Sequence, residues 1–356
     1  MAYNKEIQPG LFGQKHASRD YRQEKFWGKN QFNSSFPASL VAYMSYKGLS
    51  PAYIRIDKNN KVVHSSITGE ELFGMNPLSD NLYYNFETNF LPYEKYYTGK
   101  REHIDLVLSD YNSYEVLKGL EIKRTALPDN TTNNLGEDRY SCEIVVRPST
   151  ICYLVCSICR NYDTKKGRDK LKSLLGNFPK IKHWDVADEV IPFYPDILDA
   201  IEIVAKDMHS RQEPLMIQPI WKTNGKKPQL ADNCLDVFVW SNLAAIHMCR
   251  QGERNISRIA RHNRSIIWIY KMLFVFYVYG HFDYDNTIND LSYGTKNDKA
   301  FAISGAVSYP LLKCKELSCP RIKKDEIKNI ILGGGQNLLS PERRFDAIIV
   351  NSPNLF

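Results

Sequence analysis

Residues 103–127 contain two short, mainly apolar segments separated by a polar turn, the pattern of a strand hairpin. "HIDLVLSD" (103–110) is short and aliphatic, "YNSY" (111–114) has the character of a turn, and "EVLKGLEIKRTAL" (115–127) returns as a partner strand. "CEIVVRP" (142–148) predicts a third strand that ends at Pro148. We therefore expect a strand hairpin followed by a further strand.

Other segments predict a mixture of helices and strands. Helices are predicted over 36–49, 81–97, 149–159 and most of 241–280, with Ser149 or Thr150 as the cap of the third. Strands are predicted as a pair over 52–67, at 215–223 and at the beginning of 234–251. The predicted fold class is α/β, with a mixed sheet flanked by helices.

Charged residues interrupt the apolar strands of this hairpin, and three of them could act together. Asp105 lies in the first strand, and Glu121 and Lys123 lie two residues apart on one face of the second. A hairpin of this length brings Asp105 opposite that pair, where two carboxylates repel each other unless a cation lies between them. Hard oxygen ligands favour Mg²⁺, and a nearby lysine can polarise an attacking water. The pattern predicts metal-dependent hydrolysis of a phosphodiester, although the bare spacing also fits an amphipathic hairpin with a cross-strand salt bridge.

The order of elements strengthens the catalytic interpretation. A helix, strands with the acids, and then a strand, a helix and a strand are the arrangement of a PD-(D/E)xK nuclease core, although Ile104 stands where that motif has proline. Glu87, on the expected helix over 81–97, is a candidate for an additional acid near the metal, and Glu71 and Glu94 compete with it. Asp110 is a rival for the first acid, but it lies at the turn.

A resemblance makes this interpretation specific. "EIKRTALPDNTT" (121–132) resembles the signature of the HindVP-type (HgiDI-like) type II restriction endonucleases. Further similar stretches are "WGKNQFNSSFPASL" (27–40), "EIVVRPSTICYL" (143–154), "QPIWKTNGK" (218–226), "RSIIWIYKMLF" (264–274), "TKNDKAF" (295–301) and "LSPERRFDAII" (339–349).

The resemblance implies a homodimeric, Mg²⁺-dependent endonuclease that cuts double-stranded DNA within the palindrome GRCGYC. It implies that Asp105, Glu121 and Lys123 occupy the catalytic positions, and that a cognate DNA methyltransferase serves the same system. One endonuclease domain is expected over 1–356, with 81–160 as its catalytic core and 210–356 as elaborations for DNA recognition and dimerisation.

A stripe of arginines is a separate candidate for DNA contact. Five arginines are spaced 4, 4, 3 and 3 residues apart, which places them on one side of a helix: Arg250, Arg254, Arg258, Arg261 and Arg264. A polyanion would relieve their mutual repulsion, and the alternative is a solvated face neutralised by acids elsewhere in the fold. Candidates for base contact in loops are Lys222, Lys226, Lys296, Asn297, Lys299, Arg343 and Arg344. The basic and aromatic segment 1–36 either wraps nucleic acid or packs as a docked extension.

Composition excludes several classes of protein. A formal charge of +7 permits an anionic partner without demanding one. The apolar run 266–280 is too short to span a bilayer and carries Lys271, so it predicts a buried core helix. The first residues show no signal-peptide pattern, and we expect a bacterial cytoplasmic protein without a membrane partner. Cys152, Cys156 and Cys159 have the C-x3-C-x2-C spacing of a radical enzyme's iron–sulfur ligands, but they lie on one face of an apolar helix and are expected in the core.

Three classes of function follow, in this order. The first is a sequence-specific deoxyribonuclease, with a repair or junction nuclease on the same core as its close alternative. The second is a DNA-binding protein without catalysis, and the last is an iron–sulfur enzyme.

Overall fold

A computed structural model describes part of the chain, in ranges separated by gaps. These residues are 14–19, 38, 41–42, 45–46, 48, 50, 52–56, 62–122, 148–208, 214–217, 221–224, 227–230, 238–241, 254–257, 259 and 261–290.

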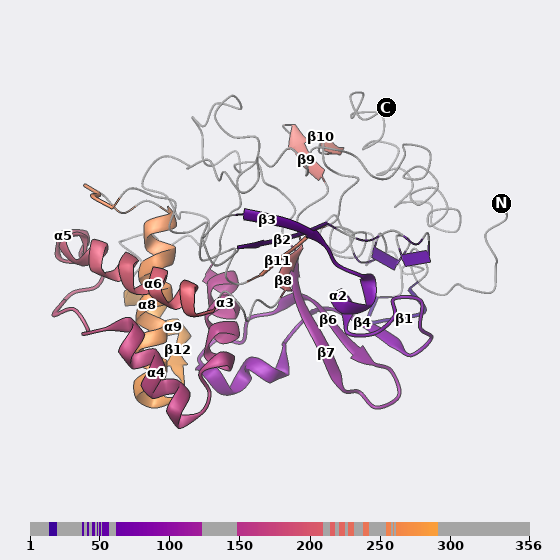
Figure 1. The fold of residues 1–356 in the computed structure, drawn as a ribbon, viewed down its shortest axis with the longest axis horizontal. Coiled ribbons are helices and arrows are strands. Elements are labelled where there is room, and N and C mark those ends of the chain that lie inside the picture. The colour runs from indigo at the N-terminus through magenta and orange to yellow at the C-terminus, as the bar shows by residue number, and fades with distance from the viewer. Residues whose placement is uncertain are drawn as a thin grey trace.

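A mixed sheet of eight strands forms the centre of the described structure (Figure 1). From one edge to the other its strands are β1 (His16–Ala17), β4 (Leu82–Thr88), β6 (Ile104–Asp110), β7 (Val116–Ile122), β8 (Pro214–Ile217), β11 (Phe238–Ser241), β2 (Ala52–Ile56) and β3 (Val62–Ser66). β4, β6 and β7 form an antiparallel meander, whereas β8 runs parallel to β7. The sheet confirms the expected hairpin and the mixed α/β class.

Helices and two small sheets complete the described elements. The helices are α2 (Gly69–Phe73), α3 (Pro148–Asn161), α4 (Lys165–Leu175), α5 (Ala187–Val190), α6 (Tyr194–Asp207), α8 (Arg261–Tyr279) and α9 (Tyr284–Asp290), with 3-10 turns η4 (Leu91–Tyr96) and η7 (Ile191–Phe193). The two-stranded sheets pair β9 (Trp221–Asn224) with β10 (Lys227–Leu230), and β5 (Tyr97–Thr98) with β12 (Phe282–Asp283).

The hydrophobic core lies where α3 meets the outer helices. Figure 1 shows α3 beside the sheet and α4, α6 and α8 gathered beyond it. Residues 151–156 of α3 are fully buried and share one cluster with the apolar face of α8. The prediction that 266–280 forms a buried core helix is confirmed, because α8 packs against α3, α4 and α6. Within the described residues, no helix combines the length and apolarity needed to cross a membrane.

The lysine in the middle of α8 has a partner within the fold. The Lys271 ammonium forms an ion pair with Asp290 of α9. It also lies 5.3 Å from the centre of the Trp184 ring, so the ring face adds a cation–π contact. These contacts explain how an otherwise apolar helix carries a lysine that is 8% exposed.

The predicted helix over 81–97 is wrong. Residues 82–88 form β4, and a 3-10 turn over 91–96 follows it. Buried Leu82, Tyr84 and Phe86 alternate with more exposed neighbours, and Tyr84 meets Phe73 of α2 edge to face. Aromatic residues suit a pleated surface, and backbone hydrogen bonds to β1 and β6 on either side stabilise the strand.

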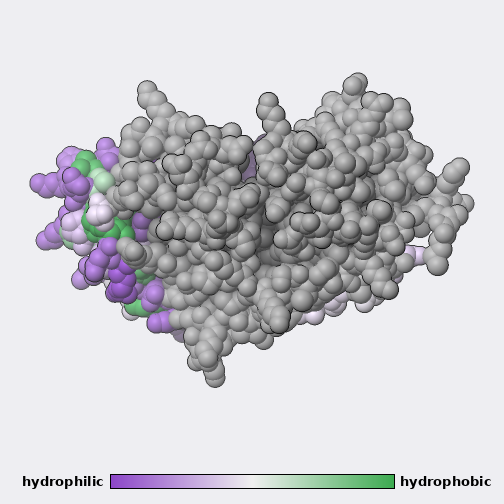
Figure 2. All heavy atoms as spheres, turned by 90° about the horizontal axis from the view of Figure 1, so that it is seen from above, coloured by the Kyte–Doolittle hydropathy of each residue, from purple (hydrophilic) through white to green (hydrophobic). Residues whose placement is uncertain are grey.

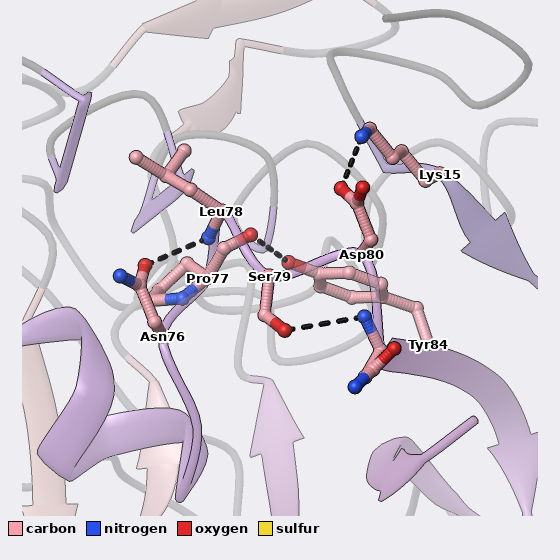
Figure 3. Close-up of polar contacts among 8 residues, drawn as sticks. Lys15, Asn76, Pro77, Leu78, Ser79, Asp80 and Tyr84 are labelled. Carbon is pink, nitrogen blue, oxygen red and sulfur yellow. Dashed lines mark hydrogen bonds and ion pairs between the residues drawn. The ribbon is translucent and has the colours of Figure 1, made fainter. Parts of the chain in front are cut away.

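A braced loop joins α2 to β4 (Figure 3). Asn76 Oδ1 accepts from the Leu78 N–H, and Ser79 Oγ accepts from the Asn81 N–H. The Tyr84 hydroxyl donates to the Pro77 carbonyl. Lys15 forms an ion pair with Asp80, which belongs to the same loop. These contacts tie the segment that precedes β1 to the beginning of β4.

Other predicted elements have mixed outcomes. The strand pair in 52–67 is confirmed by β2 and β3, while the single strand expected over 215–223 is divided between β8 and β9. Residues 38, 41–42 and 45–46 are helical, as expected for 36–49. Residues 142–147 of the expected third strand lie outside the described residues, and Pro148 is the first residue of α3.

The outer end of the helical layer has a mainly hydrophilic surface. Figure 2 shows hydrophilic side chains there, interrupted by small apolar patches. Isolated apolar residues such as Ile203, which is 45% exposed, are ordinary on a protein surface.

Candidate active site

The β6–β7 hairpin brings Asp105 and Glu121 together. Leu106 pairs with Leu120, and Leu108 pairs with Lys118. The same register continued by one residue places Asp105 opposite Glu121, and the Asp105 N–H donates to Glu121 Oε2 at 3.4 Å. The expected pairing of the two acids is therefore confirmed, with both side chains on one face of the sheet.

The surroundings of the two carboxylates differ. Glu121 is only 6% exposed, whereas Asp105 is half-buried. The hydroxyl of Thr150, in the first turn of α3, donates to Glu121 Oε1 at 3.2 Å. A buried carboxylate is costly unless hydrogen bonds replace its water, so the two donors keep Glu121 in place.

Glu87 lies on a strand, which corrects the expectation that it belongs to a helix. The pairs Phe86–Leu106 and Thr88–Ile104 lie on either side of it, so its backbone is the neighbour of Asp105 on β4. Its φ of 50° is left-handed, and its carboxylate is 3.0 Å from the Arg19 guanidinium. The register brings Glu87 beside Asp105, but Arg19 holds its carboxylate.

The buried Arg19 guanidinium is fixed from two directions. It lies 4.5 Å from the centre of the Phe86 ring and pairs with Glu87. The preceding Ser18 continues the pairing of β1 with β4, since its hydroxyl accepts from the Phe86 N–H. The N-terminal segment therefore shapes the β4 side of the site, a role for which the sequence carries no spacing signal.

The competing acids have other positions. Glu71 belongs to a capping box with Thr68, and the Thr68 backbone N–H lowers the pKa of Glu71 below its ordinary value. Asp110 accepts from the backbone N–H groups of Asn112 and Ser113, and the bond from Ser113 is the main cause of its lowered pKa. Glu94 lies in the 3-10 turn η4. Asp110 is therefore the last residue of β6, and its side chain braces the turn that follows.

The prediction of one arginine-bearing helix face is wrong. Residues 254–257 are not helical, and α8 begins at Arg261. Arg254 is exposed and paired with Asp199 of α6, whereas Arg264 is 2% exposed in the core. For Arg254 the structure therefore matches the alternative of a charge neutralised by acids elsewhere. Arg250 and Arg258, and the side chain of Arg261, lie outside the description.

The other predicted DNA contacts mostly lie outside the described residues. This is so for Lys226, Lys296, Asn297, Lys299, Arg343 and Arg344, and the predicted catalytic residue Lys123 also lies outside them. Lys222 is in β9, whose backbone pairs with β10.

The three cysteines of α3 are core residues. Cys152, Cys156 and Cys159 are free and fully buried. Burial raises the pKa of all three thiols, which keeps them in the neutral form that is a poor metal ligand. The expectation of buried cysteines is confirmed. Across the part of the chain that the structure describes, His, Cys, Asp and Glu form no group of three or more arranged to hold a metal.

The fold and the β6–β7 hairpin by themselves define a class of protein. This is a mixed α/β protein whose sheet carries two adjacent carboxylates, the groups with which many enzymes act on phosphate esters. The family model described as HindVP restriction endonuclease matches residues 27–356. The chain therefore belongs to the HindVP restriction endonuclease family.

Two curated relatives agree with this assignment over nearly their full lengths. The type II restriction enzyme HgiDI of Herpetosiphon aurantiacus is 40% identical over 98% of this chain and 97% of its own. The probable type II restriction enzyme HindVP of Haemophilus influenzae is 41% identical over 98% and 96%. No solved structure shows a significant match. The chain is thus a type II restriction endonuclease.

Thr150 contacts Glu121, and the sequence analysis did not predict this contact. We expected Ser149 or Thr150 to cap a helix, but α3 begins at Pro148, so both lie inside its first turn. Thr150 is 29 residues from Glu121, and no local pattern links the two positions.

Proposed function

We propose that this enzyme hydrolyses phosphodiester bonds of double-stranded DNA through Mg²⁺ held by Asp105 and Glu121, with Lys123 beside them. The observation that carries the proposal is the juxtaposition of the two carboxylates on paired strands. The succession of β4, β6, β7, α3 and β8 supports the further proposal of a PD-(D/E)xK core.

The donor set fits Mg²⁺. This ion takes hard oxygen ligands and typically uses one or two carboxylates, with waters and substrate phosphate completing its shell. Two acids are therefore sufficient without a third protein ligand. When bound, Mg²⁺ would supply Lewis-acid stabilisation of phosphate charge and a water of lowered pKa.

The protein's own groups have separate tasks. Glu121 is the buried, hydrogen-bonded carboxylate, while half-buried Asp105 is more open to a substrate. Lys123 is two residues beyond Glu121 in the sequence, and the period-two alternation of a strand is the reason to propose it on the same face. There its ammonium would orient the attacking water and offset charge on the phosphate. Glu87 is proposed as an outer acid of this site, available when its pair with Arg19 opens.

The finer specificity is also proposed. The resemblance to this family suggests cleavage within GRCGYC by a homodimer, acting in the bacterial cytoplasm beside a methyltransferase of the same system. Apart from the buried Arg264, the arginines and loop residues predicted to contact DNA are proposed to do so.

Cleavage of a plasmid of known sequence tests the proposal. Mg²⁺ should yield discrete fragments whose ends map to one palindrome, and EDTA should abolish them. Asp105→Asn, Glu121→Gln and Lys123→Ala should each reduce the cleavage rate at least about 100-fold, since each removes a group that acts on the reacting phosphate. Asp110→Asn is the matched control, because it changes an acid of the same hairpin but keeps an acceptor at the turn.

Other outcomes would identify the alternatives. A ladder that is independent of sequence, or cleavage of branched DNA alone, would indicate a repair or junction nuclease. Binding without cleavage under all metal conditions would indicate a non-catalytic protein.

A further inference from the structure

The hydrogen bond between Thr150 and Glu121 joins α3 to the catalytic hairpin. Both partners are buried, Thr150 completely and Glu121 to 6% exposure. Thr150 Oγ1 donates to one carboxylate oxygen, and the Asp105 N–H donates to the other. The carboxylate is therefore held at both ends, by its partner strand and by a helix.

The position of Thr150 in α3 directs its hydroxyl to this contact. A threonine inside a helix often returns its hydroxyl to a carbonyl of the preceding turn. Thr150 is two residues after Pro148, where α3 begins, and its hydroxyl is directed to Glu121. β-branching limits its side-chain rotamers, and the buried neighbours Ile151 and Tyr153 fix the helix.

We propose that Thr150 is the positioning residue of Glu121 and thereby sets the affinity of the site for its divalent cation. This inference rests on the proposed function, because it assumes that Asp105 and Glu121 bind the ion. Thr150 touches neither DNA nor the reacting phosphate in this scheme. It acts by keeping the carboxylate in one rotamer, as residues behind metal ligands commonly do.

The test measures binding of Mn²⁺ to the full-length protein without DNA, by electron paramagnetic resonance of the free ion. Thr150→Val removes the hydroxyl at nearly constant volume and should weaken binding about 10-fold or more. Thr150→Ser keeps the hydroxyl and should stay within about threefold of wild type. Ser157→Ala is the matched control, since it removes another fully buried hydroxyl from α3. If Thr150→Val does not fold, Thr150→Ala removes the same donor without placing a methyl group against the carboxylate.

A second readout separates positioning from loss of structure. The cleavage rate of Thr150→Val should recover as the Mg²⁺ concentration is raised, while Glu121→Gln should stay slow. A general packing defect would instead lower the melting temperature and leave the Mg²⁺ requirement unchanged.

The outcomes distinguish this inference from the function on which it rests. If wild type and Glu121→Gln bind Mn²⁺ equally, the proposed metal site is wrong. If Glu121→Gln loses binding and the Thr150 variant that lacks the hydroxyl binds like wild type, the site stands and the role of Thr150 is overturned.

Discussion

Arg254 and Arg264 show that the surroundings of a residue decide its role more than its type does. Both belong to the same predicted stripe, but Arg254 is on the surface beside Asp199, and Arg264 is inside the core near the beginning of α8. Exposed pairs contribute little to stability, whereas removing a buried charged side chain breaks its interactions and leaves a cavity. Arg254 is therefore accessible for contact with a DNA phosphate, whereas Arg264 would have to leave the core to make such a contact.

Alanine substitutions at these two positions test that difference. Arg264→Ala should lower the free energy of unfolding by about 3 kcal/mol, as for other broken buried charges. Arg254→Ala should change it much less, because water replaces the contact with Asp199. Urea titrations followed by circular dichroism measure both. Equal losses would contradict the assignment from burial.

α3 combines a structural and a functional task within one element. Its first turn supplies Thr150 to Glu121, and its following residues carry the three cysteines into the core. The helix also connects the site to α8, against which it packs. A change in the core face of α3 should therefore reach Glu121 through the position of Thr150.

The cysteines report on this packing. Alkylation with iodoacetamide should be roughly 1,000-fold slower at Cys152, Cys156 and Cys159 in the native protein than in guanidinium, because reaction requires α3 to open and the thiols to ionise. Mass spectrometry of timed samples assigns the label to each site. Rapid labelling of Cys156 in the native protein, or copurification of iron, would support the alternative of an iron–sulfur enzyme.

At the scale of the whole molecule, the site depends on segments that are far apart in the chain. β7 ends at Ile122, and its parallel neighbour β8 begins at Pro214, after α3, α4, α5 and α6. β1 reaches the same sheet from the N-terminal side and brings Arg19 to Glu87. The acids themselves come from one local hairpin, but the groups that surround them come from the rest of the fold.

The proposed homodimer is a prediction at this scale. A palindrome has two-fold symmetry, so two copies of the chain would each cut one strand. Sedimentation should give twice the chain mass of 41.2 kDa. Mixed dimers of wild type and Asp105→Asn should nick a plasmid instead of linearising it. A monomeric mass on DNA, together with linearisation by the mixture, would contradict the proposal.

Local periodicity alone determined the β6–β7 hairpin, the adjacency of Asp105 and Glu121, the core helix α8 and the buried cysteines of α3. Each of these features lies within one element or between two elements that are consecutive in the chain. Residues close together in the sequence therefore carry its pattern. Only the tertiary structure decided that 82–88 is a strand, that 254–257 is not helical, and that Thr150 contacts Glu121. An aromatic segment fits more than one local structure until backbone partners from β1 and β6 satisfy its hydrogen bonds. Burial of Arg264 and the contact of Thr150 likewise depend on residues far away in the chain, which no local pattern records.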